Sequence, residues 1–456
     1  MPARSIAVLV SISFALCVAW IVVLPPWQGP DEPAHYAYVE RLANGQLPPI
    51  DGGELHFSQA LSASVARSLL SYRTRGSRPS TRLGQRILIG PEPDGLSTAG
   101  HAAAGATSYP PLYYTLMLPF YALGDRAVER LYWIRLGSAL IATVFTALTS
   151  LLIFDVTASH RLALGAGLLA ALPPMLSQAG AIVSPDILLA AGCAGSMLAL
   201  RRAVKTASRR RIAAVLVALA VVSLSKPVGV PLAAVLVVSF AGRACVRAGT
   251  RSRPMVAATT VLVVLAAAYA ERFVIPSTIT AHPVASVREL LSYLWQFYLP
   301  RLGFMQPLFQ DSVLSQPVPV WGTFVRTGIG YFGWISAPMP DWSYVAVVAG
   351  TAAALLVALG DPRRRRSAAA GQAALFILLT LAVLHLAEFS VLITGSGSIL
   401  QGRYLLPAIP AGLVIFCALL ARASRQVQSI GMGIAIATWL LAAAVGLSSA
   451  LEFYAT

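Results

Sequence analysis

The sequence has 456 residues, of which 57% are apolar and 11% are charged. Soluble domains carry about 45–50% apolar and about 25% charged residues. The formal net charge is +16, from 34 basic and 18 acidic residues. A nucleic-acid-binding protein can be as basic, but it does not contain apolar runs of about 20 residues, the length that crosses a bilayer. A soluble enzyme, a secreted disulfide-rich protein and a disordered chain are therefore excluded.

The apolar runs predict an all-α polytopic membrane protein with about 11 transmembrane helices. The predicted spans are residues 6–24, 132–154, 161–178, 186–200, 212–225, 228–242, 255–275, 342–360, 371–394, 405–421 and 430–452. Basic residues in short loops stay on the cytoplasmic side. They lie at Arg4 and in the segments 201–211, 243–253, 363–366 and 422–425. All of them fit one topology, with the amino terminus in the cytoplasm and the carboxyl terminus outside.

Two apolar segments allow more than one interpretation. Residues 109–123 are hydrophobic, but 15 residues make only about 22 Å of helix, and a crossing there would put the 201–211 cluster outside. We expect an interfacial or re-entrant helix, with a short span as the alternative. Residues 1–24 could be a signal peptide. No small-x-small cleavage site precedes the proline pair at 25–26, so we expect a retained first helix.

The predicted spans divide the chain into three parts. Residues 1–275 form a transmembrane module that includes a first outer loop, residues 25–131. Residues 276–341 form a second outer loop that is rich in aromatic residues, and residues 342–456 hold the carboxyl-terminal transmembrane helices. We expect the outer loops to carry short amphipathic or juxtamembrane helices.

Two adjacent carboxylates and a histidine directly follow the first predicted helix, in the sequence QGPDEPAHY at 28–36. A carboxylate at the membrane surface can accept a proton from a substrate hydroxyl. Asp31 is the candidate base, with Glu32 beside it. Asp31 also fits the N-cap of a helix with Pro33 in its first turn. The two roles are compatible.

Three further motifs place charged residues at predicted outer helix ends. Asp186, in the sequence SPD, is either a second carboxylate of the site or a helix cap. Lys226, in the sequence SKP, either snorkels to the interface or binds an anion. Arg403, in the sequence QGRY, either forks onto a phosphate or anchors its helix at the interface.

The second outer loop contains the sequences LPRLGF at 299–304 and FGW at 332–334. Such aromatic segments form an interface belt, or they stack on a sugar or line a lipid groove. Arg301 is a third candidate for phosphate binding. The candidate lining of the substrate cavity is His35, Tyr36, Tyr109, Tyr113, Trp334, Gln401 and Tyr404. No metal site and no required cofactor are expected, and a divalent cation on the acidic residues is compatible but not indicated.

The sequence PDEPAHY after a first helix resembles the bacterial membrane-protein family called domain of unknown function 2142. The resemblance continues through SPD, SKP, LPR, FGW and QGRY, over residues 10–410. That family is similar to GT-C membrane glycosyltransferases. The resemblance implies a GT-C-like fold and transfer of a sugar from a polyprenyl-phosphate donor, usually with inversion. It implies Asp31 as the base, Asp186 as the second acidic position, and Lys226 and Arg403 as ligands of the donor phosphate.

The predicted function is an integral glycosyltransferase of the bacterial inner membrane, with its active site on the outer face. Its expected partners are a polyprenyl-phosphate-linked sugar, a cell-envelope glycan or glycolipid acceptor and membrane lipids, but not nucleic acid. The alternatives are a lipid-linked glycan transporter or flippase, and a non-catalytic scaffold of an envelope-synthesis complex. A transporter needs polar residues through the bilayer midplane, where Glu388 is the main acidic residue.

Overall fold

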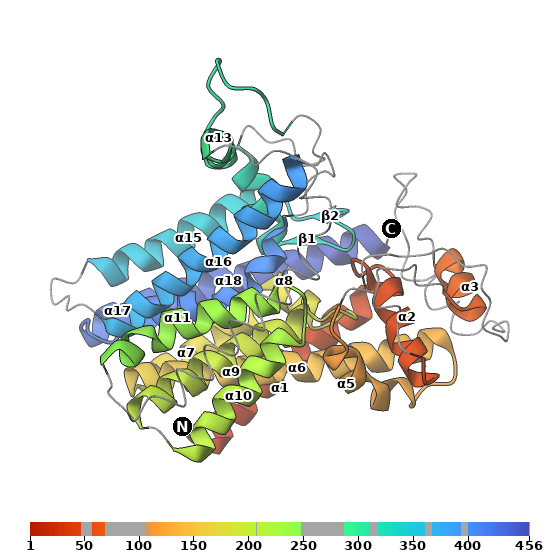
Figure 1. Ribbon diagram of the computed structural model, residues 1–456, viewed down its shortest axis with the longest axis horizontal. Helices are drawn as coiled ribbons and strands as arrows, with labels where there is room; N and C mark the ends of the chain where they lie inside the picture. The colour runs from red at the N-terminus through yellow and green to blue at the C-terminus, as the bar shows by residue number, and fades with distance from the viewer. Residues whose placement is uncertain are drawn as a thin grey trace.

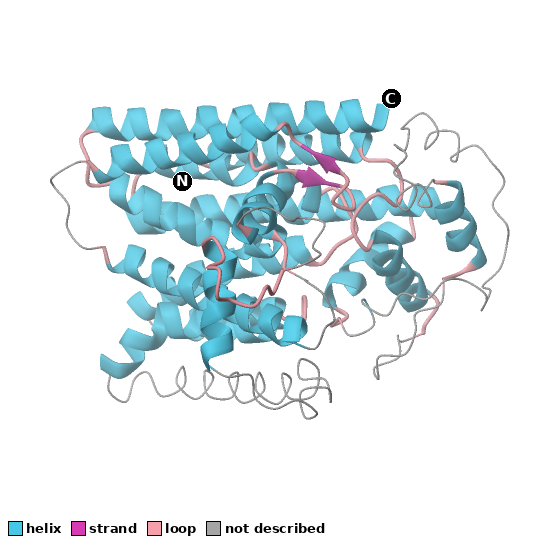
Figure 2. Ribbon diagram, turned by 90° about the horizontal axis from the view of Figure 1, so that it is seen from above, coloured by secondary structure: helices cyan, strands magenta, loops and turns pink. Residues whose placement is uncertain are grey.

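The computed structural model describes residues 1–46, 57–68, 106, 109–206, 208–247, 287–309, 318–360, 367–393 and 400–455. Within these ranges the ordered elements are almost all helical, and a short antiparallel ribbon joins β1 (Tyr331–Phe332) to β2 (Ala337–Pro338). The long helices run side by side, as Figures 1 and 2 show from two directions. The predicted span at 255–275 lies outside the described residues.

Seven of the described helical segments are long and apolar enough to cross a membrane. They are α1 (Ala3–Val23), α6 (Ala127–Thr157), α9 (Asp186–Lys205), α15 (Asp341–Leu359), α16 (Ala368–Ile393), η7 (Gly402–Ala408) continued by α17 (Ile409–Leu420), and α18 (Arg425–Ala455). The prediction of an all-α polytopic membrane fold is confirmed. The count of 11 spans stays a prediction.

Shorter helices occupy three of the other predicted spans. The run at 161–178 is divided into α7 (His160–Ala171) and α8 (Pro174–Ala179). Two consecutive prolines, Pro173 and Pro174, interrupt it, because proline removes a backbone donor and disfavours helix at the preceding residue. Next come α10 (Arg209–Ser223) and α11 (Gly229–Arg247). The turn between them contains Lys226.

A group of short helices covers one end of the bundle: α2 (Glu32–Ala43), α3 (Gln59–Arg67) and α5 (Leu112–Tyr121) (Figure 1). The last of these lies in the segment 109–123. Its 10 residues rise only about 15 Å, half of the roughly 30 Å hydrocarbon layer. A helix of this length is too short to cross, which agrees with the interfacial interpretation.

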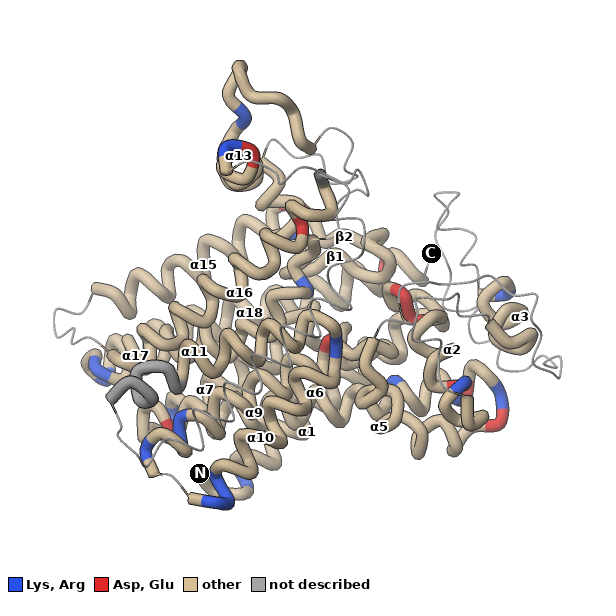
Figure 3. The backbone as a smooth tube through the Cα atoms, in the orientation of Figure 1, with Lys and Arg blue, Asp and Glu red and all other residues tan. Residues whose placement is uncertain are grey.

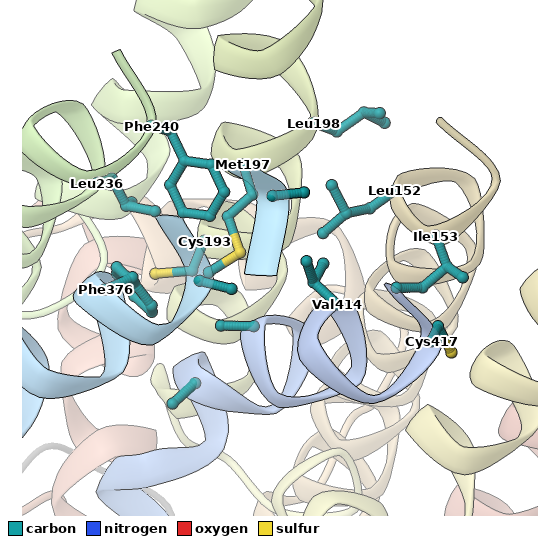
Figure 4. Close-up of a cluster of buried hydrophobic side chains, with 14 of the residues drawn as sticks. Leu152, Ile153, Cys193, Met197, Leu198, Leu236, Phe240, Phe376, Val414 and Cys417 are labelled. Atoms are coloured by element: carbon teal, nitrogen blue, oxygen red, sulfur yellow. The ribbon is translucent and has the colours of Figure 1, made fainter. Parts of the chain in front are cut away.

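Apolar side chains fill the interior between α6, α9, α11, α16 and α17. Leu152, Met197, Phe240, Phe376 and Val414 are among the buried members of this cluster (Figure 4). Burial of a large aliphatic or aromatic side chain stabilises a fold by about 1.5–3 kcal/mol relative to its exposure in water. Between helices in a bilayer, where lipid tails are as apolar as the side chains, close packing provides the stabilisation instead. The cluster therefore fixes the positions of the helices whose ends carry the polar motifs.

Charged residues gather at the ends of the bundle (Figure 3). At the end where α1 and α10 begin, Asp155 lies 2.9 Å from Lys205 and 3.4 Å from Arg201. The opposite end carries α2 and α5. The cytoplasmic location of the basic end remains a prediction from charge.

A fully buried ion pair joins the start of α2 to α6. Nη2 of Arg135 lies 2.7 Å from Oε2 of Glu32, and Nε lies 2.9 Å from Oε1. Glu32 also accepts hydrogen bonds from the backbone N–H groups of Gly29 and Val183. Arg135 donates to two carbonyls directly after α1. The pair therefore holds together α1, α2, α6 and the turn before α9.

We expect Arg135→Ala to lower the free energy of unfolding by about 3–5 kcal/mol, because it leaves the buried Glu32 carboxylate without its cation. The matched control is Arg202→Ala. Arg202 pairs with Asp155 at 3.8 Å, and its side chain is 45% exposed, so its loss is expected to cost less than about 1 kcal/mol. Unfolding in mixed detergent micelles, followed by tryptophan fluorescence, measures both. Equal effects would contradict the structural role of the buried pair.

Candidate active site

Asp31 stands at the open end of the turn between α1 and α2. It is the N-cap residue of α2, and its backbone is left-handed, with φ 59°. This conformation is uncommon outside glycine, and aspartate tolerates it better than most residues. It sends neighbouring side chains in opposite directions. The Glu32 side chain is fully buried, whereas that of Asp31 is 56% exposed.

Asp31 begins a chain of four alternating charges from four different segments. Its Oδ2 lies 3.4 Å from Nη2 of Arg403, at the start of η7. Nε of Arg403 lies 3.9 Å from Oδ2 of Asp186, the first residue of α9. Oδ1 of Asp186 accepts a hydrogen bond from Nζ of Lys226 at 2.6 Å. The sequence motifs at 31, 186, 226 and 403 thus meet at one place.

The members of this chain differ sharply in exposure. The side chains of Asp186, Lys226 and Arg403 are only 8–10% exposed. They line a small crevice together with Tyr404 and Pro407. Within the described part of the chain, Nε of Arg403 has no hydrogen-bond partner. An unsatisfied donor on a buried cation is costly, and an anion oxygen in the crevice would satisfy it.

Aromatic rings surround the buried lysine. Nζ of Lys226 lies 4.6 Å from the ring centre of Tyr404 and 5.6 Å from that of Tyr109. Burial alone would lower the pKa of Lys226, but Asp186 and the two tyrosines favour its charged form and raise that pKa above its ordinary value. Burial raises the pKa of Tyr109. The lysine is therefore a cation at neutral pH, and Tyr109 keeps its hydroxyl proton.

His35 lies one turn after Asp31 on the buried side of α2. Its Nδ1 shares a hydrogen bond with the hydroxyl of Tyr114 at 2.8 Å, and its ring packs 5.5 Å from that of Tyr109. Burial, which outweighs the opposing effect of Asp31, lowers the pKa of His35 to about 4. The imidazole is therefore neutral at pH 7 and adds no positive charge beside Asp31.

Several predicted site residues instead form the framework behind the charged chain. The Glu32 carboxylate is occupied by Arg135 and two backbone donors. The Tyr113 hydroxyl pairs with Ser138 and accepts the backbone N–H of Ser184. The Tyr36 ring is fully buried against Trp27. We therefore assign these residues a structural role in place of direct contact with a substrate.

The other predicted residues take three different positions. Gln401 is the N-cap residue of η7, two positions before Arg403. Nε1 of Trp334 donates to the carbonyl of Trp27, in the turn before Asp31. The exposed Arg301 donates to the carbonyl of Met305, within its own loop. No ion pair joins Arg301 to the described residues of the charged chain.

Arg135 and Tyr114 were not among the predicted site residues. The signal for Arg135 is an arginine within a predicted span, because a cation at that depth requires a partner. Tyr114 stacks on Tyr38 at 3.8 Å and bonds to His35. The sequence alone does not distinguish Tyr114 from the other tyrosines of the segment 109–123. Over the described part of the chain, no group of three or more His, Cys, Asp and Glu residues has metal-binding geometry.

The arrangement can bind an anion and hold a base next to it. Two buried cations line one crevice, and an unsatisfied guanidinium donor belongs to one of them. Asp31 lies on the exposed side of the same guanidinium. A bound phosphate ester would thus have its negative charge balanced and a carboxylate nearby.

Comparisons with known proteins give a family and structures of low similarity. The family described as predicted membrane protein (DUF2142) matches residues 14–412. ArnT from Cupriavidus metallidurans bound to undecaprenyl phosphate is 17% identical, with TM-score 0.48, and the match covers 94% of this chain and 62% of ArnT. Arabinosyltransferase EmbB from Mycobacterium smegmatis is 14% identical, with TM-score 0.44, 94% coverage of this chain and 31% of EmbB. The chain thus spans less than two thirds of either protein. No curated protein has significant sequence similarity to it.

The buried His35 predicts a loss of stability in acid. Its pKa is about 4 in the folded chain and about 6.5 in an unfolded one. As the pH falls from 6.5 to 4, the unfolded state takes up the proton first, so we expect stability to drop by about 3 kcal/mol. The dependence of Tm on pH should flatten in His35→Gln and persist in His160→Gln, which changes an exposed histidine. An unchanged slope in His35→Gln would contradict this assignment.

Proposed function

The chain belongs to the DUF2142 family of predicted membrane proteins, and we propose that it is a GT-C-type membrane glycosyltransferase. It would transfer a sugar from a polyprenyl-phosphate donor to a cell-envelope glycan or glycolipid. Arg403 and Lys226 would bind the donor phosphate, and Asp31 would act as the base. The reaction would take place at the outer face of the bacterial inner membrane.

The observation that carries this proposal is the position of Asp31 beside Arg403. The Arg403 guanidinium lies next to the exposed carboxylate of Asp31. It also lies next to Asp186, which pairs with the buried Lys226. A phosphate bound by Arg403 would have its ester oxygen near Asp31. A salt bridge with only a structural role at the surface would not require Lys226 as a second buried cation, because removing a cation from water is costly.

The proposed step is a displacement at the anomeric carbon. Asp31 accepts the proton of the acceptor hydroxyl, and the hydroxyl oxygen forms the new bond to that carbon. The bond from the carbon to the phosphate oxygen breaks, and its electron pair leaves with the lipid phosphate. Arg403 and Lys226 stabilise the negative charge that develops there. A single displacement of this kind inverts the anomeric centre.

The neighbouring residues support these roles. Asp186 holds the Lys226 ammonium by a 2.6 Å hydrogen bond, and so acts as a positioning residue. Tyr109 and Tyr404 flank the ammonium with aromatic faces. Such rings exclude water on that side, and electrostatic attraction to a phosphate is stronger where water is excluded. The neutral His35 keeps competing positive charge away from the base.

We expect Lys226→Gln to weaken binding of undecaprenyl phosphate by about tenfold or more, because a charge-assisted hydrogen bond is lost. The matched control is Lys205→Gln. The sequence contains only these two lysines, and Lys205 pairs with Asp155 at the other end of the bundle. Binding is measured with the purified proteins in nanodiscs. Equal affinities of the two variants for undecaprenyl phosphate would show that Lys226 does not bind the donor phosphate.

We expect Asp31→Asn to lower turnover by about 10²–10⁴-fold, the usual contribution of a general base. Undecaprenyl phosphate binding should persist, because the two cations remain. Release of undecaprenyl phosphate from a panel of its sugar esters measures turnover whatever the acceptor is. Asp125→Asn is the control, since Asp125 is an exposed carboxylate in a different loop. Unchanged turnover in Asp31→Asn would overturn the mechanism.

A further inference from the structure

An apolar cavity of about 350 Å³ lies within the bundle, on the other side of η7 from the charged crevice. It is bounded by α7, α15, α17 and α18, and by the segment from η6 (Trp321–Arg326) to α14 (Thr327–Ile329). Leu169, Ala354, Leu413 and Trp439 are representative of its lining. A cavity with an apolar lining accepts apolar ligands.

The single helix η7 separates the two spaces. Gly402 and Leu405 line the apolar cavity, whereas Arg403 and Pro407 line the charged crevice. The wall is tight. A Cβ atom added at Gly402 would lie 2.3 Å from the backbone nitrogen of Gly328. The cavity is therefore distinct from the proposed phosphate site for the donor.

A partly buried arginine lies at one end of the cavity wall. Arg326 belongs to η6, two residues after Phe324 and two before Gly328, which both line the cavity. Its side chain is 17% exposed, and its Nε has no hydrogen-bond partner among the described residues. Nη2 lies 3.3 Å from Asp341, whose side chain is 85% exposed. Such an exposed pair is worth only about 0–1 kcal/mol, so a lipid phosphate can replace the carboxylate.

The first turn of α15 lies beside this arginine, and the part of α15 that lines the cavity begins about two turns further along. The guanidinium of Arg326 lies 5.4 Å from the ring centre of Tyr344. Thr351 follows seven residues later on α15 and lines the cavity. Seven residues make about two turns and rise about 10 Å, so the two side chains share a face. Trp342, which is 56% exposed, begins the helix as an interfacial aromatic does. The cation thus lies near the end of α15, about 10 Å along the helix from the apolar space.

We propose that this cavity binds an anionic glycerophospholipid, with its phosphate on Arg326 and one acyl chain between α15, α17 and α18. The cation matches the phosphate, and the apolar lining matches the chain. The volume of about 350 Å³ has room for part of an acyl chain. The site goes beyond the proposed transferase function and does not depend on it.

The test removes the two halves of the site separately. Gly412→Leu fills the cavity, because a Cβ atom at Gly412 meets no atom within 4 Å. Gly433→Leu is its matched control: Gly433 is an exposed glycine of α18 with equally open space. Leucine is a better helix former than glycine, so both variants are expected to fold. Arg326→Gln removes the headgroup cation and leaves only the exposed Asp341 without its partner.

The measurement is native mass spectrometry of each purified protein titrated with dioleoyl phosphatidylglycerol, with phosphatidylcholine as the zwitterionic comparison. We expect the wild type and Gly433→Leu to bind one phosphatidylglycerol. Gly412→Leu and Arg326→Gln should each weaken that binding by about tenfold, the effect of losing one charge-assisted hydrogen bond or its equivalent. Lys226→Gln should leave it unchanged, which separates this site from the donor crevice.

Three results would overturn the proposal. The first is undiminished phosphatidylglycerol binding in both Gly412→Leu and Arg326→Gln. The second is equal binding of phosphatidylglycerol and phosphatidylcholine to the wild type. The third is a competition experiment on the Lys226→Gln variant in which undecaprenyl phosphate displaces bound phosphatidylglycerol at a lower concentration than unlabelled phosphatidylglycerol does. That result would make the occupant a polyprenyl lipid.

Discussion

The buried pair of Glu32 and Arg135 is the interaction on which the site depends. It is fully enclosed, and each of its charges is satisfied by several hydrogen bonds. Breaking such a pair on one side is far more costly than breaking an exposed one. Its hydrogen bonds also reach the backbone after α1 and the turn before α9. Asp31 and Asp186 lie directly beyond these two anchored segments. The pair of Glu32 and Arg135 therefore fixes the distance between Asp31 and Asp186, which Arg403 bridges.

Two adjacent carboxylates thereby acquire opposite properties. The left-handed backbone at Asp31 turns one side chain outward and allows the next to point into the bundle. Glu32 is fully enclosed by its donors and is not available to a substrate. Among the described residues, the Asp31 carboxylate has one partner, Arg403, at 3.4 Å. A carboxylate that must exchange protons during a reaction is better held by one loose contact than by the four close hydrogen bonds of Glu32. The Arg403 guanidinium can then leave Asp31 and bind an incoming anion.

The sequence predicts the polar cluster better than it predicts individual roles. Asp186, Lys226 and Arg403 each stand at a helix end on one predicted side, so their meeting follows from topology. The roles of Asp31 and Glu32 could not be separated, because Arg135 is 103 positions away and the left-handed turn has no sequence signature. The break in the span at 161–178 did have a signal, the proline pair at 173–174. The length of the apolar run outweighed it, because the residues on both sides of the prolines are apolar.

The helix η7 shows how one short segment can serve two environments. Gly402, Leu405 and Leu406 line the apolar cavity, while Arg403, Tyr404 and Pro407 line the charged crevice. The glycine allows the backbone of η7 to touch Gly328, and no larger side chain fits there. The sequence QGRY thus combines a packing requirement with a cation, because the close contact that Gly402 permits is what holds Arg403 against Asp31 and Asp186.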